Sequence, residues 1–511
     1  MTPSPPERAG PRRRPPALAL AALAILAAAG TALAAPGPYA LGTHTSGDAD
    51  LAERVRQDIA DPTGYHGLSV ALVEPGPDGE LRVRVAGLGE EGAGEPVAED
   101  TRFGSASVAK VLPGMLLADM VDRGEVALDT EVGALLPDLD FADPEVAGLT
   151  VEELATHTSG LSREATTLPQ TLWQFAAKRH PEPYGSVDDF LRDVAAHARV
   201  DPATRGTNAY SNTGVDLLGH ALAAQAGTTY TELVGERILD PLGMADSAVW
   251  TADGGPAHLV HDADRGRPIA LDRSEANGPS GGLVTTASDL ALLVAAMMDG
   301  TAPGASAARA LRPGDVERRE QGLGWYVETL GGRAVTGHGG NATTNGHTAW
   351  IGYTGERGAV VLSNTHRFSE DVGLRLVGID EPSPDNATGE SVYAAATVLL
   401  ALLPGLLALG FAARRRPGRW WRRPTDRLGL VSYGLAGAAA LWYAHLSGFW
   451  HLVSPWVWTS GVLLLVGAAA VGARRWPELP TARGRTPWPR WLRTAPPMAA
   501  SCAVLVVLAL L

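Results

Sequence analysis

The part of the chain after residue 392 contains four apolar segments, at about 393–413, 428–446, 455–473 and 495–511. Each is long enough, or nearly long enough, to cross about 30 Å of hydrocarbon as a helix. No Asp, Glu, Lys or Arg lies inside any of the four. Buried charges mark ion or proton pathways, so their absence favours a passive anchor over a transporter. We therefore predict a membrane domain at 393–511 with about four transmembrane helices.

The loops between these segments differ in charge. Seven arginines lie between the first two segments and six between the last two, whereas residues 447–454 contain no Arg or Lys. Arginine-rich loops tend to stay in the cytoplasm, which places residues 36–390 outside the cell. The sequence thus predicts a multi-pass protein of the cell membrane.

Residues 1–35 have the pattern of an export signal. Four arginines between residues 8 and 14 precede an apolar stretch at 17–29, and Ala32-Leu33-Ala34 offers a cleavage site. If the segment stays uncleaved as an anchor, the residues after it still lie on the outer side. We therefore expect a signal peptide at 1–35, an extracellular domain at 36–379, a turn-rich linker at 380–392 and the membrane domain.

Charge and cysteine content exclude several functions. The net charge is −14. From residue 391 onward, 13 arginines against Asp426 and Glu478 give +11, which leaves −25 for residues 1–390. Such an acidic portion argues against nucleic-acid binding. The single cysteine, Cys502, allows neither a disulfide framework nor a thiolate metal site.

Residues 36–380 alternate strand-like and helix-like segments. Short β-type runs occur at 68–73, 81–85, 333–336 and 359–362, and helical patterns at 107–123, 186–197, 214–226 and 288–299. Pro113 is expected to make the first of these helices irregular. Strands at both ends of a helical middle predict an α+β domain whose terminal strands share one sheet.

Ser107 and Lys110 form a Ser-x-x-Lys pattern at the start of the first helical segment. Lys110 is one of only two lysines among 42 basic residues. Unlike arginine, a lysine amine can lose its proton when it is desolvated. Because positions i and i+3 share a helix face, we expect Ser107 as nucleophile and Lys110 as base to lie within reach of each other.

Two further polar motifs follow downstream. Tyr210 and Asn212 lie in a turn-like stretch before a helix, where a tyrosine can shuttle a proton and an amide can orient a substrate. Residues 336–341 read Thr-Gly-His-Gly-Gly-Asn after a short strand, and include His338 and Gly340. Their glycines would let a substrate backbone lie close against that strand.

With these motifs in this order, the chain resembles the serine β-lactamase and penicillin-binding-protein superfamily, in its class C-like and D,D-peptidase branch. Segments at 154–161, 238–244, 280–289 and 360–364 also look characteristic of that family, so the resemblance covers about residues 50–370. It implies a fold with an antiparallel sheet flanked by helices and an all-helical subdomain.

The resemblance also implies roles for the site residues. Ser107 would attack a carbonyl and form an acyl-enzyme, with Lys110 and Tyr210 passing its proton to the leaving group. Asn212, His338 and Gly340 would bind substrate. The backbone N–H groups of Ser107 and Asn341 would form the oxyanion hole. No cofactor and no metal are implied.

The glycine-rich motif departs from the pattern of many β-lactamases in a way that affects the expected substrate. Many β-lactamases have Lys-Thr-Gly where this chain has His338-Gly339-Gly340, and the lysine and threonine help to bind a substrate carboxylate. Histidine variants resemble the peptidases and esterases of the superfamily, so efficient β-lactam hydrolysis is not expected. The expected substrate is a small-molecule or peptide acyl compound outside the cell, with no protein partner indicated. A ligand-binding sensor or membrane-complex subunit without turnover is the alternative.

Three other patterns are interpreted as non-catalytic. Gly278-Pro-Ser280-Gly-Gly282 fits G-x-S-x-G but lacks the buried strand that a nucleophile elbow needs before it. His258 and His261 lack a helical HExxH context for a metal. In the family-like segment at 154–161, His157 and Ser159 are expected to be structural.

Overall fold

The computed structural model describes residues 35–37, 39–91, 94–163, 184–250, 263–264, 267–268, 274–342, 346–365, 367–414 and 425–481, with residues 498 and 501. The chain divides into two compact units. One comprises residues 38–392, and the other comprises residues 1–37 together with 393–511. The predicted export signal at 1–34 lies outside the described residues.

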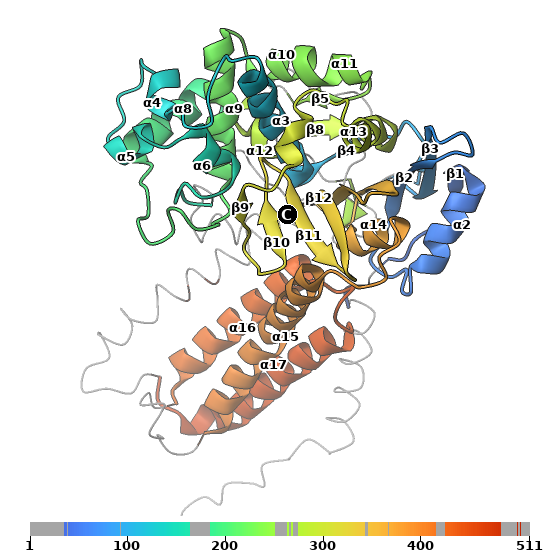
Figure 1. Ribbon diagram of the computed structural model, residues 1–511. Helices are drawn as coiled ribbons and strands as arrows, with labels where there is room; N and C mark the ends of the chain where they lie inside the picture. The colour runs from blue at the N-terminus through green and yellow to red at the C-terminus, as the bar shows by residue number, and fades with distance from the viewer. Residues whose placement is uncertain are drawn as a thin grey trace, which may run out of the picture. The chain divides into compact units, whose positions relative to one another are not determined.

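The first unit is built on an antiparallel sheet of nine strands (Figure 1). Its order is β1-β3-β2-β14-β13-β12-β11-β10-β9. The strands are β1 (Thr45–Gly47), β2 (Gly67–Pro75), β3 (Leu81–Gly89), β9 (Arg312–Pro313), β10 (Arg319–Gln321), β11 (Tyr326–Leu330), β12 (Arg333–Ala342), β13 (His347–Tyr353) and β14 (Gly358–Ser363). Two small sheets also form, from β4 (Phe103–Gly104), β5 (Ala248–Val249) and β8 (Leu283–Thr285), and from β6 (Ala263–Asp264) and β7 (Arg267–Pro268).

The first and last parts of this unit meet in the middle of the large sheet. Strand β2 pairs with β14 in an antiparallel register that sets Val70 opposite Val361. All six residues of β14 are buried, because helices cover both faces of the sheet at this point, and such strands read as nearly continuous apolar runs. The prediction that the terminal strands share one sheet is confirmed.

Helices cover the two faces of the sheet. Helix α13 (Ala287–Asp299) packs on β2, β3, β13 and β14, whereas α2 (Ala49–Asp58) and α14 (Glu370–Leu376) pack on β3, β13 and β14. Two apolar cores result, one of which joins α13 to the helical part and one of which lies beneath α2 and α14. The domain therefore has the predicted architecture, an antiparallel sheet flanked by helices.

The other helical segments form a separate group beside the sheet (Figure 1). They are η1 (Ala106–Lys110), α3 (Val111–Asp122), α4 (Val132–Leu135), α5 (Pro144–Ala147), α6 (Val151–Ala155), α8 (Val187–His197), α9 (Asn212–Ala226), α10 (Tyr230–Val234), η2 (Gly235–Leu239), α11 (Asp240–Leu242), η3 (Glu275–Asn277), α12 (Gly278–Gly281) and η4 (Ala305–Ala308). Caps fix several of their starts. In α6, for example, Thr150 and Glu153 form a reciprocal capping box.

The irregularity expected at Pro113 lies before the proline. Residues 106–110 form the 3₁₀ segment η1, and α3 begins only at Val111. Pro113 is the third residue of α3. A proline in the first helical turn removes no intrahelical hydrogen bond, because the N–H groups there have no partner in any case. The change of helix type at Lys110, rather than a kink at Pro113, therefore sets how Ser107 is presented.

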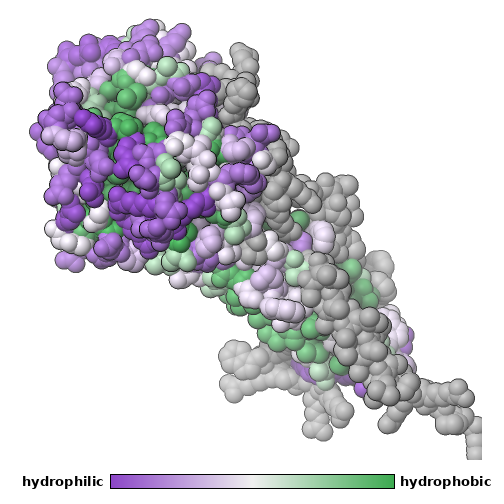
Figure 2. Space-filling model, turned by 90° about the vertical axis from the view of Figure 1, so that its right-hand side faces the viewer, coloured by the Kyte–Doolittle hydropathy of each residue, from purple (hydrophilic) through white to green (hydrophobic). Residues whose placement is uncertain are grey.

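Three long helices follow, α15 (Pro384–Ala413), α16 (Arg427–Ser447) and α17 (Trp456–Arg475), and then η5 (Trp476–Glu478). Helix α15 begins in the first unit, and its residues from Tyr393 onward belong to the second unit with α16, α17 and η5. Small residues lie where α15 meets α17, and a Cβ on Gly461 would collide with the carbonyl oxygen of Ala401. Figure 2 shows apolar side chains on the described surface of these helices, where Leu399, Leu403 and Leu406 are exposed.

Two helices, 386–413 and 456–478, are long and apolar enough to cross a membrane. Helix α16 has sufficient length but is not one of the two candidate spans, and the fourth predicted segment, 495–511, lies almost entirely outside the described residues. Residues 384–392, expected in a turn-rich linker, instead form the first turns of α15. The composition of residues 384–392 favours turns. They are helical here because the apolar helix after them extends back to Pro384.

The core beneath α2 should dominate the stability of the first unit. Leu72 is fully buried there, so we expect Leu72→Ala to lower the free energy of unfolding by about 2–5 kcal/mol. Leu292 of α13 is 38% exposed, and Leu292→Ala should cost less than about 1 kcal/mol. Denaturant unfolding of the full chain in detergent, followed by tryptophan fluorescence, measures both variants. Equal losses would contradict this assignment of the core.

Candidate active site

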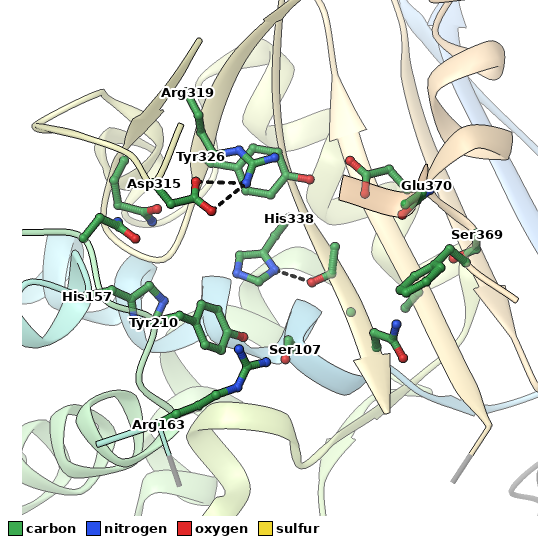
Figure 3. A pocket seen from close by; sticks show the side chains of 18 residues that line it. Ser107, His157, Arg163, Tyr210, Asp315, Arg319, Tyr326, His338, Ser369 and Glu370 are labelled. Atoms are coloured by element: carbon green, nitrogen blue, oxygen red, sulfur yellow. Dashed lines mark hydrogen bonds and ion pairs between the residues drawn. The ribbon is translucent and has the colours of Figure 1, made fainter. Parts of the chain in front are cut away.

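A cavity of about 360 Å³ lies between the end of the large sheet and the helical group (Figure 3). Its walls come from η1, β10, β11, β12, α14, the first turn of α15 and the loops before α8 and α9. It is lined by Ser107, His157, Arg163, Asn208, Tyr210, Asp315, Arg319, Gln321, Tyr326, His338, Gly339, Gly340, Asn341, Ala349, Phe368, Ser369, Glu370 and Asn386.

Ser107 enters this pocket from η1. The residue before it, Ala106, has a left-handed backbone with φ of +46°, a conformation that costs roughly 1–2 kcal/mol when a Cβ is present. Lys110 lies one turn after Ser107, and its Nζ donates a hydrogen bond to Ser107 Oγ over 3.1 Å. The two residues of the Ser-x-x-Lys motif are therefore in direct contact.

Lys110 is buried, with only 1% of its surface exposed. Besides Ser107, its Nζ donates to the carbonyl oxygen of Ser280 over 2.5 Å and lies 5.1 Å from the centroid of the Tyr210 ring. The amine thus sits among a hydroxyl, a carbonyl and an aromatic face, away from water. Its contact with Ser107 Oγ places the amine where a base for that serine has to lie.

Asp216 of α9 fixes the carbonyl that Lys110 contacts. Its carboxylate accepts hydrogen bonds from the backbone N–H of Ser280 over 2.9 Å and from Ser280 Oγ over 3.0 Å. Both residues are buried, so these donors compensate a desolvated charge. The sequence reasoning missed Asp216, although an acidic residue in an otherwise apolar helical segment is a signal for such a role.

The Tyr210 ring is packed between polar groups. The His157 ring lies 4.4 Å from it between centroids, and the guanidinium carbon of Arg163 lies 4.9 Å from its centroid. His157 has a left-handed backbone with φ of +58°, and its Nδ1 accepts a hydrogen bond from the backbone N–H of Ser211 over 3.3 Å. His157 therefore supports the Tyr210 segment, in line with its expected structural role.

Strand β12 carries the glycine-rich motif past Ser107. It extends to Ala342, well beyond the short run at 333–336 that the sequence indicates. A Cβ on Gly340 would lie 2.6 Å from the carbonyl oxygen of Ser105 and 3.0 Å from the backbone nitrogen of Ser107. Only glycine permits this approach, which brings the end of β12 against η1.

Both pocket histidines are neutral at ordinary pH. Burial, together with the nearby Lys110, lowers the pKa of His157 to about 3 and that of His338 to about 3. The Nδ1–H of His338 donates to the carbonyl oxygen of Gly339 over 2.7 Å, which leaves Nε2 as an acceptor in the neutral ring. His338 therefore supplies no positive charge where the related motif has a lysine.

At the far end of the pocket, the positive charge of Arg319 is balanced by carboxylates. Arg319 donates to Asp315 over 3.1 Å and to Glu328 over 2.8 Å, and its guanidinium carbon lies 4.8 Å from the centroid of the Tyr326 ring. Burial raises the pKa of Tyr326 well above its ordinary value of 10, so its phenol stays protonated. None of these residues belongs to a motif, and no local pattern indicates them.

Most of the residues predicted for the site meet at this pocket. Those that line it are Ser107, Tyr210, His338, Gly340 and Asn341. Lys110 does not line the pocket but donates a hydrogen bond to Ser107 Oγ. Asn212 is not among the lining residues. It is the first residue of α9, and its Oδ1 is buried.

The patterns interpreted as non-catalytic have other environments. Ser280 lies in the short helix α12 and directs its hydroxyl to Asp216, so it is not on a strand-to-helix elbow. Ser159 Oγ accepts a hydrogen bond from the backbone N–H of Leu161. His258 and His261 lie outside the described residues.

The fold and the buried Ser-Lys pair define an α+β domain with a Ser-x-x-Lys centre. Residues 52–380 match the family model described as Beta-lactamase, and the chain belongs to this family. In solved structures the fold is similar to that of a class C β-lactamase, with a TM-score of 0.52, 20% identity, and coverage of 65% of this chain and 95% of that chain.

Two relatives of this chain are named as a penicillin-binding protein and as a carboxypeptidase/endopeptidase. Penicillin-binding protein 4 of Amycolatopsis lactamdurans is 30% identical over 240 residues, covering 44% of this chain and 58% of that protein. D-alanyl-D-alanine-carboxypeptidase/endopeptidase AmpH of Escherichia coli (strain K12) is 29% identical over 249 residues, covering 47% and 60%. The match thus spans less than two thirds of the length of each relative.

The close approach of β12 to η1 gives a test of the site geometry. Gly340→Ala should force the two segments apart, destabilise the fold by about 1–3 kcal/mol and slow acylation of Ser107 by roughly 10²–10³, the usual effect of losing an oxyanion donor. Labelling of Ser107 by a fluorophosphonate measures the rate. Gly355→Ala, where no atom lies within 4 Å of the new Cβ, is the matched control. Equal labelling rates in the two variants would contradict this role of Gly340.

The buried histidines predict a pH dependence of stability. His338 has a pKa of about 3 in the folded chain and about 6.5 when unfolded. Between these values the unfolded chain binds more protons, so stability is complete above about pH 6.5 and falls as the pH decreases, by roughly 1.4 kcal/mol per pH unit. His338→Gln should reduce this slope by that amount in denaturant titrations between pH 6 and 4. An unchanged slope would show that His338 does not titrate in this way.

Proposed function

We propose that this chain is a membrane-anchored serine hydrolase that forms an acyl-enzyme at Ser107. The observation that carries this proposal is the 3.1 Å hydrogen bond between Lys110 Nζ and Ser107 Oγ, made by a lysine that is 1% exposed, at the wall of a pocket. A nucleophile in contact with a desolvated base is the arrangement that activates a serine. A domain that only bound ligands would have no physical need for it.

The reaction runs in two steps. Ser107 Oγ bonds to the substrate carbonyl carbon while its proton passes to the Lys110 amine, which acts as the base. The proton then reaches the leaving atom by way of Tyr210, and the bond between that atom and the carbonyl carbon breaks. In the second step, water attacks the acyl-enzyme, gives a proton to the same pair of residues, and restores Ser107 with release of the acid.

Charge develops on the substrate carbonyl oxygen during both steps. We assign its stabilisation to the backbone N–H groups of Ser107 and Asn341, because Gly340 lets β12 lie directly against η1. Such preorganised donors commonly contribute the largest single part of the rate enhancement. Gly340 and the neutral acceptor Nε2 of His338 line the substrate path. Asn212 does not line the pocket, and its Oδ1 is buried at the start of α9, so the pocket gives no support to the substrate-binding role expected for it.

The favoured substrates are D-amino-acid peptides, as in a carboxypeptidase, or esters, rather than β-lactams. The His338-Gly339-Gly340 sequence lacks the lysine and the hydroxyl of Lys-Thr-Gly, and His338 is neutral. A relative named as a D-alanyl-D-alanine carboxypeptidase supports the peptidase branch.

The protein would act at the outer surface of the cell membrane. Two described helices have the length and apolarity of membrane spans, and arginine-rich loops at 414–427 and 474–493 favour a cytoplasmic location for those loops. The catalytic unit then faces outward, as the export-type sequence at 1–35 also favours. The substrate is a small acyl compound or peptide outside the cell.

Mass spectrometry of the intact full chain in detergent tests this function. We expect a fluorophosphonate to add one covalent label to the wild type and none to Ser107→Ala, because no other serine contacts a buried lysine among the described residues. A penicillin, tested separately, distinguishes a peptidase-like site, which it acylates, from an esterase-like one. Folded wild-type protein that neither reagent labels would favour the alternative, a ligand-binding sensor.

A further inference from the structure

The charges around the pocket are unevenly compensated. Lys110 is buried beneath Ser107, and Arg319 is bonded to two carboxylates. Arg163 is exposed at the pocket wall, and among the described residues no carboxylate pairs with its guanidinium. Figure 3 shows this guanidinium beside Tyr210 and Ser107, whereas the carboxylate of Glu370 lies on the other side of His338. Arg163 is therefore the cation that is available to a ligand near Ser107.

The backbone of Arg163 is held by hydrogen bonds to the segment that contains Tyr210 and Asn212. Its carbonyl oxygen accepts a hydrogen bond from the backbone N–H of Asn212 over 3.0 Å. The neighbouring carbonyl oxygen of Ser162 accepts from Ser211 Oγ over 2.7 Å. The chain at 162–163 is thus attached to the Tyr210–Asn212 segment by two hydrogen bonds. The guanidinium then stacks on the Tyr210 ring, with 4.9 Å from its carbon to the ring centroid.

We propose that Arg163 is a specificity residue that binds a carboxylate of the substrate beside Ser107. The inference rests on the proposed acyl-enzyme function and names its substrate class: acyl amino acids, peptides or esters that carry a free carboxylate near the reacting carbonyl. A guanidinium presents paired N–H donors that match the two oxygens of a carboxylate. Stacking on an aromatic ring holds the planar group in place before the ligand arrives.

This assignment also accounts for the altered glycine-rich motif. The lysine and hydroxyl that would bind a carboxylate from β12 are replaced by His338 and Gly339. Since burial lowers the pKa of His338 to about 3, that ring carries no charge at neutral pH. Arg163 restores a permanent positive charge to the same pocket from the opposite wall, on the loop after α6.

Ligand protection of Ser107 tests the proposal on the full chain in detergent. A neutral fluorophosphonate labels Ser107, and two matched pairs of ligands compete with it. One pair is N-acetyl-D-alanyl-D-alanine and its C-terminal amide. The other is a glutaric acid monoester and its diester. We expect each carboxylate to protect the wild type at roughly 10- to 100-fold lower concentration than its neutral partner, the usual strength of a hydrogen bond to a charged group.

Three variants separate the explanations. Arg163→Gln should remove most of this preference and still be labelled by the neutral probe, whereas Arg163→Lys should retain part of it, since an ammonium lacks the paired donors. Arg199→Gln, which removes an exposed arginine that does not line the pocket, should behave as the wild type. A wild type that is labelled but shows no carboxylate preference in either pair, or an unchanged preference in Arg163→Gln, overturns the assignment. Wild-type protein that is not labelled overturns the proposed function instead.

Discussion

The buried amine of Lys110 is the point on which the rest of the site depends. Its Nζ is held between Ser107 Oγ and the carbonyl oxygen of Ser280. An amine in such a place loses its hydration, and only well-placed acceptors make this tolerable. The elements around it serve this placement: the 3₁₀ turn of η1 puts serine and lysine on one side, and Asp216 holds α12 so that a carbonyl, rather than a carboxylate, meets the amine.

The close packing of the β12 backbone against η1 is the second constraint on the geometry of the site. Gly340 lets β12 lie against η1 with no room for a Cβ. Because β12 is also hydrogen-bonded along its length to β13, the large sheet fixes its position, and the helical group fixes η1. The reacting groups thus lie where the large sheet meets the helical group, whose side chains share one apolar core. This arrangement gives rigid placement from both sides while leaving a cavity between them.

The sequence predicts the parts of this site that are encoded locally. Ser107 and Lys110 are one turn apart, and Tyr210 and the glycine-rich motif have characteristic neighbours, so their residues could be identified before their geometry was known. Asp216 and Arg163 could not, because their importance comes from contacts with residues distant in sequence or in another motif. The start of α15 also differs from the turn-rich linker that composition predicts. Residues 384–392 have the composition of a turn, but the apolar helix after them extends the helical conformation back into them.

The electrostatics of the pocket follow from burial more than from residue type. His338 and His157 are titratable residues, yet desolvation and the nearby Lys110 keep both neutral. A second permanent cation on β12 would act on the buried amine of Lys110 with little water between them. The permanent charge lies instead on Arg163, whose side chain is exposed and is held against the Tyr210 ring. Water screens an exposed guanidinium strongly, so it can attract an anionic substrate with less effect on the buried base. The Tyr210 ring, whose centroid lies 5.1 Å from Lys110 Nζ and 4.9 Å from the guanidinium carbon of Arg163, therefore has two functions. It is the proposed proton shuttle, and it is the surface on which the proposed anion-binding guanidinium stacks.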